Sequence, residues 1–154
     1  MRKFLVVCVL AAVILAGWCF HKRLFQDDEK RIREIIHEME LAAEKKSADG
    51  LMDYFSRDYK DSSGNTRFVV YGMVKRTLQR VDELRVTVSD VSVTVAGDRA
   101  WADMEVVAEA VRDGEVSYPF GSDRDPETPS LTFKKTGTGD WKIIKVENVQ
   151  GGGF

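Results

Sequence analysis

The chain has 154 residues, a length that suits one folded domain. Its 23 basic and 25 acidic residues give a net charge of −2, which favours neither a nucleic-acid binder nor a protein with an acidic tail. The composition, 44% hydrophobic and 31% charged, is that of a globular protein. Two cysteines and two histidines are too few for a disulfide scaffold or a Cys/His zinc site, so we expect no metal and no cofactor.

Residues 4–20 form an uncharged run of seventeen residues, FLVVCVLAAVILAGWCF, with basic residues on both sides. This length is at the lower edge of a transmembrane helix and slightly long for the core of a signal peptide. Trp18 is bulky where a signal peptidase prefers a small residue, and with Phe20 it suits a membrane interface. We expect residues 1–25 to be an uncleaved membrane anchor. The alternatives are a cleaved signal, which would leave a secreted protein, and a buried N-terminal helix.

The basic residues around this run specify its orientation weakly, although a short N-terminal tail commonly leaves the following domain outside the cytoplasm. Four of the 23 basic residues lie at or before Arg23, so residues 24–154 hold 19 basic and 25 acidic residues, a net charge of −6. Such a domain would stand off anionic lipid and would not bind nucleic acid nonspecifically.

Three helices are predicted after the anchor. Asp27 and Asp28 suit the N-cap of a first helix, which should end near Lys45 and Lys46. Its apolar residues recur at helical spacing: Ile32, Ile35, Ile36, Met39 and Ala43. Ser47 can cap a shorter second helix, which should contain Leu51, Met52, Tyr54 and Phe55. A third helix is expected over 66–81, with an apolar stripe of Tyr71, Val74, Leu78 and Val81.

The hydrophobic period changes to two after Asp82, which predicts strands. Valines and a leucine alternate on even positions up to Val88 and on odd positions from Val91, so we expect a β-bulge or a bend at Ser89–Asp90. Turns at 97–98 and 113–114 bound a strand over 100–111, and a polar loop is expected over 121–130. The strands 131–135 and 141–149 form a last hairpin, and residues 151–154 form a loose tail.

Helices followed by an antiparallel sheet predict an α+β fold. Two stretches carry a family resemblance: LMDYFSRDY, residues 51–59, and GDWKII, residues 139–144. The first looks like the second helix, and the second like the closing strand, of the nuclear transport factor 2-like superfamily. The order of elements agrees over about residues 27–149. The resemblance implies a cystatin-like α+β cone over residues 26–150, in which about three helices pack on a curved antiparallel sheet. An N-terminal anchor followed by one such domain resembles the arrangement of bacterial proteins. We therefore expect a single-pass protein of the inner membrane with its soluble domain in the periplasm or outside the cell.

The superfamily includes isomerases, dehydratases, binding modules and dimeric scaffolds, and the fold does not choose among them. Enzymes of this type use a pocket acid as base and a tyrosine or an acid as oxyanion donor. On the strand 100–111, the even positions are small and apolar and should face the pocket, so Asp103, Glu105 and Glu109 should face outward. This parity argues against a catalytic carboxylate on the strand, unless a bulge reverses it.

Four aromatic residues are candidates for lining a pocket, although such residues are more often ordinary core: Tyr54, Tyr59, Tyr71 and Trp141. An outward Trp101 on a polar strand face, beside Asp103 and Glu105, indicates an interface, and sheet faces in the superfamily commonly form dimers. The acidic loop 123–127 lacks the pattern of a calcium loop and is expected to be solvated.

We therefore expect a noncatalytic binding or assembly module, anchored to the membrane through residues 4–20 and partnered by a second copy or a membrane-protein complex. The alternatives are an isomerase- or dehydratase-type enzyme and a carrier of a small apolar ligand. The enzyme would require one of four acids to point into the cavity beside a tyrosine: Asp53, Asp58, Asp103 or Glu105.

Overall fold

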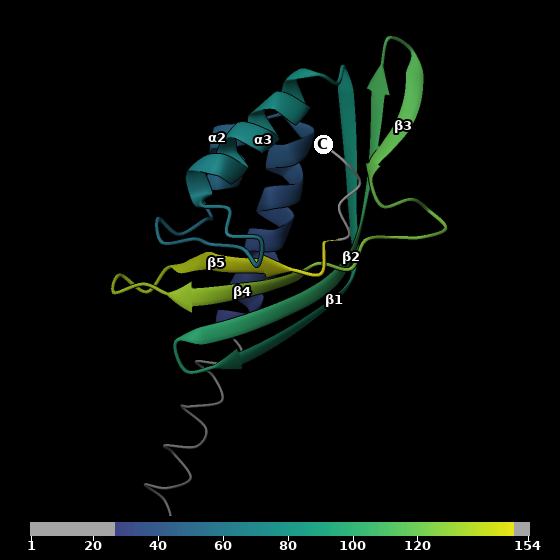
Figure 1. Ribbon diagram of the computed structural model, residues 1–154. Helices are drawn as coiled ribbons and strands as arrows, with labels where there is room; N and C mark the ends of the chain where they lie inside the picture. The colour runs from purple at the N-terminus through teal and green to yellow at the C-terminus, as the bar shows by residue number, and fades with distance from the viewer. Residues whose placement is uncertain (1–26, 150–154) are drawn as a thin grey trace, which may run out of the picture.

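A computed structural model describes residues 27–149, and Figure 1 shows their arrangement. The helices lie against one face of a strongly curved antiparallel sheet, which confirms the expected α+β cone. The predicted anchor over residues 4–20 and the predicted tail over 151–154 lie outside the described residues. Within residues 27–149, no helix is both long and apolar enough to cross a bilayer.

Three helices precede the sheet in the described part of the chain. The first covers residues 27–44, is called the N-terminal helix below, and buries the expected isoleucines at 32, 35 and 36. α2 (Ala48–Met52) begins after Ser47, whose Oγ accepts a hydrogen bond from the Gly50 N–H at 3.1 Å. α3 (Arg67–Gln79) is shorter at both ends than the expected 66–81 and buries Leu78.

Two expectations about the helices are wrong. Asp27 and Asp28 lie inside the N-terminal helix and do not cap it. The Asp28 carboxylate instead accepts hydrogen bonds from Lys135 Nζ at 2.7 Å and Trp141 Nε1 at 2.9 Å. α2 ends at Met52, so Tyr54 and Phe55 lie beyond it.

The chain after α2 leaves the helix because it pairs with the sheet. The Tyr54 carbonyl accepts a hydrogen bond from the Ile143 N–H at 2.8 Å, and the Ser56 N–H donates to the Ile143 carbonyl at 2.8 Å. Phe55 thereby forms an isolated parallel bridge with Ile143. Backbone pairing with a distant strand here overrides the helical spacing of the apolar side chains.

The sheet has five strands in the described residues, in the order β1-β2-β4-β5, with β3 paired to β2. Their bounds are β1 (Glu83–Ala96), β2 (Arg99–Arg112), β3 (Glu115–Phe120), β4 (Ser130–Lys135) and β5 (Trp141–Glu147). The two halves of β2 have different partners, because β4 pairs with residues 99–103 and β3 with residues 108–112. The sequence predicts no strand for β3, and β5 stops short of the expected Val149.

The β-bulge expected at Ser89–Asp90 is confirmed. Ser89 pairs with Glu105 and Ser92 pairs with Asp103, so two residues of β1 lie opposite one residue of β2. Asp90 takes a left-handed backbone conformation with φ of 49°, as an extra residue in a bulge can require. The bulge keeps the apolar residues of both halves of β1 on the side of the helices, and β1 and β2 bend around them (Figure 1).

Candidate functional site

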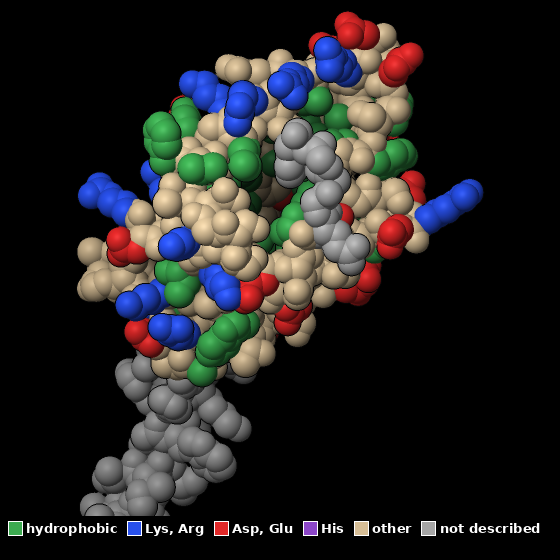
Figure 2. Space-filling view, viewed as in Figure 1, with side chains coloured by type: hydrophobic (Ala, Val, Ile, Leu, Met, Phe, Trp, Pro, Cys, Tyr) green, Lys and Arg blue, Asp and Glu red, His purple; other side chains and the backbone are tan. Residues whose placement is uncertain are grey.

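A cavity of about 610 Å³ lies between the helices and the concave face of the sheet, and it is called the cone cavity below. Figure 2 shows this face of the molecule hollowed near its centre. The N-terminal helix, α3 and the inward positions of β1 and β2 supply about half of the wall, including Met39, Met73, Val88, Met104 and Ala108. The volume is within the range of about 300–1,000 Å³ that is usual for sites of small molecules.

Tyr59 contributes a polar group to this apolar wall. Its side chain is 4% exposed and packs edge-to-face against Phe55, with ring centroids 5.0 Å apart. Among the described residues, no side chain or backbone group forms a hydrogen bond with the Tyr59 hydroxyl. Burial, and secondarily the charge of Asp61, raises the pKa of this hydroxyl to about 12. Tyr59 is therefore protonated at neutral pH and can donate a hydrogen bond to a bound molecule.

Three carboxylates also line the cone cavity, and each already has a partner in the chain. Asp61 accepts hydrogen bonds from the Asn65 N–H at 2.8 Å and from Asn65 Nδ2 at 2.9 Å. Glu40 accepts from the Val88 N–H at 3.4 Å and lies 3.0 Å from His37 Nδ1. Glu147 forms an ion pair with a lysine of its own strand, Lys145, at 2.6 Å. These contacts give every cavity carboxylate a structural role.

A second cavity, of about 530 Å³, lies at the start of α3 and is called the α2–α3 cavity below. Asp53 and Tyr71 both line it, together with Arg57 and Arg67. Arg67 donates to the Met52 carbonyl at 2.9 Å, which ties the first turn of α3 to the end of α2. Asp53 thus lies in a polar cavity beside a tyrosine, whereas Asp58, Asp103 and Glu105 line neither cavity.

The structure does not bring the four candidate aromatic residues together. Tyr59 lines the cone cavity and Tyr71 the α2–α3 cavity. Trp141 is 1% exposed and belongs to the core, with its indole N–H donating to Asp28.

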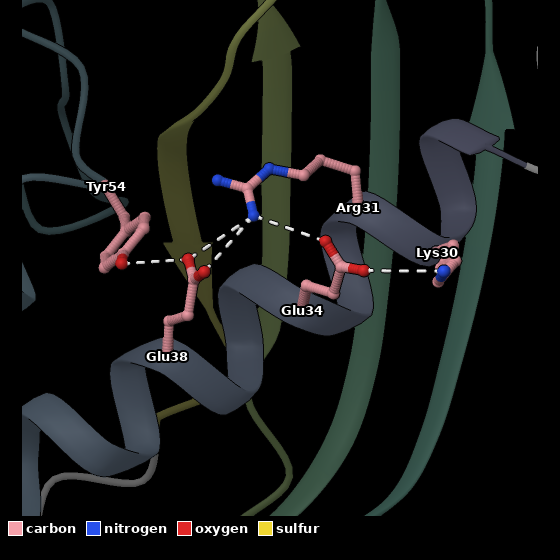
Figure 3. A network of polar contacts seen from close by, with 5 residues as sticks. All are labelled: Lys30, Arg31, Glu34, Glu38 and Tyr54. Atoms are coloured by element: carbon pink, nitrogen blue, oxygen red, sulfur yellow. Dashed lines mark hydrogen bonds and ion pairs between the residues drawn. The ribbon is translucent and has the colours of Figure 1, made fainter.

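Tyr54, the fourth candidate, lies apart from both cavities. Its hydroxyl donates to Glu38 Oε2 at 2.9 Å, at the end of a chain of ion pairs along the N-terminal helix (Figure 3). In this chain Arg31 bridges Glu34 and Glu38, and Lys30 lies 3.8 Å from Glu34. Burial, followed by the hydrogen bond to Glu38, raises the pKa of Tyr54.

The parity prediction for β2 is confirmed. Its even positions from 100 to 110, including Ala102 and Met104, are buried or half-buried, and Trp101 and Asp103 are exposed on the opposite face. Trp101 is 38% exposed and lies between Thr94 of β1 and Thr132 of β4, and Glu105 on the same face is half-buried. The expected interface at these residues remains a prediction.

The sequence did not indicate Asp61 as a site residue, although its charge contributes to the raised pKa of Tyr59. Asp61 is in a loop, Asp61–Ser62–Ser63–Gly64–Asn65, which carries no periodicity to indicate a direction. An Asp followed by Asn four residues later is an ordinary turn signal, and the two residues do form that turn.

Comparison with models of protein families shows to which family the chain belongs. The model of the SnoaL-like domain matches residues 32–147, which include all of the strands and most of the helices described above. This chain belongs to the SnoaL-like domain family.

Solved structures agree with the SnoaL-like fold. A nuclear transport factor 2-like protein with a cystatin-like fold from Novosphingobium aromaticivorans has a TM-score of 0.69 at 22% identity, covering 90% of this chain and 92% of that one. A candidate scytalone dehydratase from the same organism has a TM-score of 0.63 at 14% identity, covering 79% and 83%. A candidate dehydratase of the same fold family from Streptomyces avermitilis has a TM-score of 0.64 at 14% identity, covering 79% and 94%. Among curated proteins, none matches this SnoaL-like chain.

Proposed function

We propose that this protein is a noncatalytic binding module that takes up a small apolar molecule in the cone cavity. The observation that carries the proposal is the cavity itself, about 610 Å³ with a predominantly apolar wall. Burying apolar surface there would supply the binding free energy, at about 25 cal/mol for each Å² removed from water. The Tyr59 hydroxyl supplies a hydrogen-bond donor that would orient a bound molecule.

The noncatalytic part of the proposal rests on the partners of the cavity carboxylates. A general base needs an oxygen that is poised to take a proton from the substrate. Glu40 holds the backbone of β1 at Val88, and Glu147 is paired with Lys145. Asp61 is bound by the neutral Asn65 and is the cavity carboxylate on which the second candidate function below depends. Asp103 and Glu105 lie on the opposite face of β2 from the cavity lining.

The proposal includes a location. Residues 4–20 have the length and flanking charge of a single membrane span, and we propose that they hold the domain at a bacterial inner membrane, outside the cytoplasm. A module at this position could take apolar molecules from the bilayer or pass them to it.

Binding of a neutral probe tests the function. The full-length chain in zwitterionic nanodiscs should raise the fluorescence anisotropy of 9-anthracenemethanol above that measured with empty nanodiscs. Ala108→Phe would place a phenyl ring in the cavity from β2 and should abolish this binding. Ala96→Phe adds the same ring at an exposed site of β1 and should leave the binding unchanged.

Should Ala108→Phe not fold, Val74→Phe offers the same test from the opposite wall, on α3. Unchanged probe binding in a folded cavity-filling variant would refute the proposed site.

A catalytic function is the second candidate, and two observations favour it. Asp53 lines the α2–α3 cavity together with Tyr71, as the enzyme hypothesis requires of one of its four acids. Asp61 and Tyr59 line the same cavity, and Asp61 acts electrostatically on the Tyr59 hydroxyl. Two structural neighbours are described as candidate dehydratases, which gives a reaction class to test. The test is whether the protein converts a bound ligand that carries a hydroxyl group. If Asp61→Asn and Tyr59→Phe both abolish this conversion but retain binding, the result would favour the enzyme over the binding module.

A further inference from the structure

The charges around the cone cavity all have one sign. Among the described residues that line it are Glu40, Asp61 and Glu147, and no lysine, arginine or histidine belongs to the lining. The charge of Glu147 is offset by Lys145, which lies at 2.6 Å. Asp61 is bound by the neutral Asn65 and forms no ion pair with another described residue, so no opposite charge in direct contact offsets it.

Asp61 and Tyr59 form a polar site within the apolar wall. Tyr59 is 4% exposed as a residue, lines the cavity and has no hydrogen-bond partner among the described residues, so its hydroxyl is free to bind a molecule in the cavity. Each oxygen of Asp61 accepts one hydrogen bond from Asn65 and has capacity for another. Both residues line the same cavity, and the Asp61 charge acts on the Tyr59 hydroxyl, so a ligand there has a phenolic oxygen and a carboxylate available to it.

The chemistry of this pair favours a protonated amine. An ammonium group carries three donors, which the Asp61 carboxylate and the Tyr59 oxygen can both accept, and its charge complements that of Asp61. A carboxylate or phosphate group would meet the Asp61 charge in a partly desolvated site without a cation to offset it, and would be repelled.

We propose that the cone cavity selects its ligands by charge and binds apolar molecules that carry one amine. The amine would lie at Asp61 and Tyr59, and the apolar body would lie against the methionines and valines of the wall. This inference rests on the proposed binding function.

Three probes with one apolar body and different head groups test this selection. They are 9-(aminomethyl)anthracene, 9-anthracenemethanol and 9-anthracenecarboxylate, measured by fluorescence anisotropy on the full-length chain in zwitterionic nanodiscs. The amine should bind roughly three- to fivefold more tightly than the alcohol, which is the size expected for one partly exposed charge pair. The carboxylate should bind more weakly than the alcohol, and added salt should reduce the preference for the amine.

Two variants that each remove one negative charge test whether the preference for the amine depends on Asp61. Asp61→Asn keeps one oxygen, which can still accept from the Asn65 N–H, and should bring the affinity for the amine down to that for the alcohol. Asp58→Asn removes an exposed carboxylate outside the cavity lining and should preserve the preference.

The outcomes separate the two proposals. Equal binding of amine and alcohol, or tighter binding of the carboxylate, would overturn the charge selection and leave the binding function standing. Failure of all three probes to bind would overturn both. If Asp61→Asn does not fold, the order of the three probes and its salt dependence on the unaltered chain still decide the question.

Discussion

Two tyrosines that follow α2 differ in how their hydroxyl groups are satisfied. Tyr54 donates to Glu38 at 2.9 Å, and its hydroxyl joins the ion pairs of the N-terminal helix. Tyr59 is 4% exposed, and its hydroxyl has no partner among the described residues. Because the Tyr54 hydroxyl is already engaged within the chain, the hydroxyl of Tyr59, which lines the cone cavity, is the better indicator of a ligand.

Because the pKa of Tyr59 is raised in the folded protein, we expect the free energy of unfolding to fall at alkaline pH. Burial raises this pKa from 10.0 to about 12, so the unfolded chain loses this proton first as the pH rises. The contribution of Tyr59 to the free energy of unfolding is complete below pH 10 and is lost between pH 10 and about 12. Between pH 9 and 11, the unaltered chain should therefore lose about 1 kcal/mol more than Tyr59→Phe.

Urea unfolding of both chains at pH 9, 10 and 11 measures this difference. Since the lysines and the other tyrosines titrate in both proteins, the comparison isolates position 59. Parallel loss of stability in the two chains would show that Tyr59 ionises as an ordinary exposed tyrosine does.

At the scale of elements, the chain covers the edges of β1 and β5, two of the three outer strands of the sheet. The Val88 and Val86 N–H groups of β1 donate to Glu40 and Glu44 of the N-terminal helix, at 3.4 and 3.2 Å. At the other side of the sheet, the Ile143 N–H of β5 donates to Tyr54. Covered edges leave fewer free backbone groups for pairing with other chains.

The N-terminal helix is also held to the last hairpin by one carboxylate. Asp28 accepts from Lys135 and from the buried indole of Trp141, and its side chain is 16% exposed. Asp28→Ala should lower the free energy of unfolding by about 2–3 kcal/mol, because it leaves the buried indole N–H without an acceptor and the half-buried Lys135 ammonium without its carboxylate, with only the Trp141 ring 5.4 Å away.

The control is Glu34→Ala, which removes two ion pairs, with Lys30 and Arg31, whose side chains are about half exposed or more. This change should cost less than about 0.5 kcal/mol. Urea unfolding followed by far-ultraviolet circular dichroism compares the two variants. Equal costs would mean that Asp28 does not fasten the helix to the hairpin.

The bulge in β1 makes a prediction about a single backbone position. Asp90 has φ of 49°, a conformation that β-branched side chains adopt only with strain. Asp90→Val should cost about 1–2 kcal/mol, and Asp90→Gly should be neutral or slightly stabilising. Ser92→Val, at an exposed and regular position of the same strand, should be nearly neutral. A neutral Asp90→Val in urea unfolding would contradict the strain at the bulge.

For the whole molecule, the sequence predicts those features that depend on local periodicity. The change of parity between Val88 and Val91 indicates the bulge, and the alternation along residues 100–111 assigns the two faces of β2. It does not predict that Trp141 hydrogen-bonds Asp28, 113 positions away, or that Tyr59 and Asp61 meet at one cavity. These contacts depend on how distant segments pack, and periodicity reports only which face of an element is buried.

The relation of the whole chain to a membrane gives the last prediction. Residues 4–20 should keep the protein in the membrane fraction during washes with high salt and with alkaline carbonate, and detergent should release it. Salt should have no effect because the span is held by apolar burial, and the net charge of −6 on residues 24–154 provides no attraction to anionic lipid. Leu10→Arg, which places a charge in the middle of the run, should weaken this retention. A soluble product whose mass lacks the first segment would instead establish a cleaved signal, and the cone cavity would then take its ligand from solution.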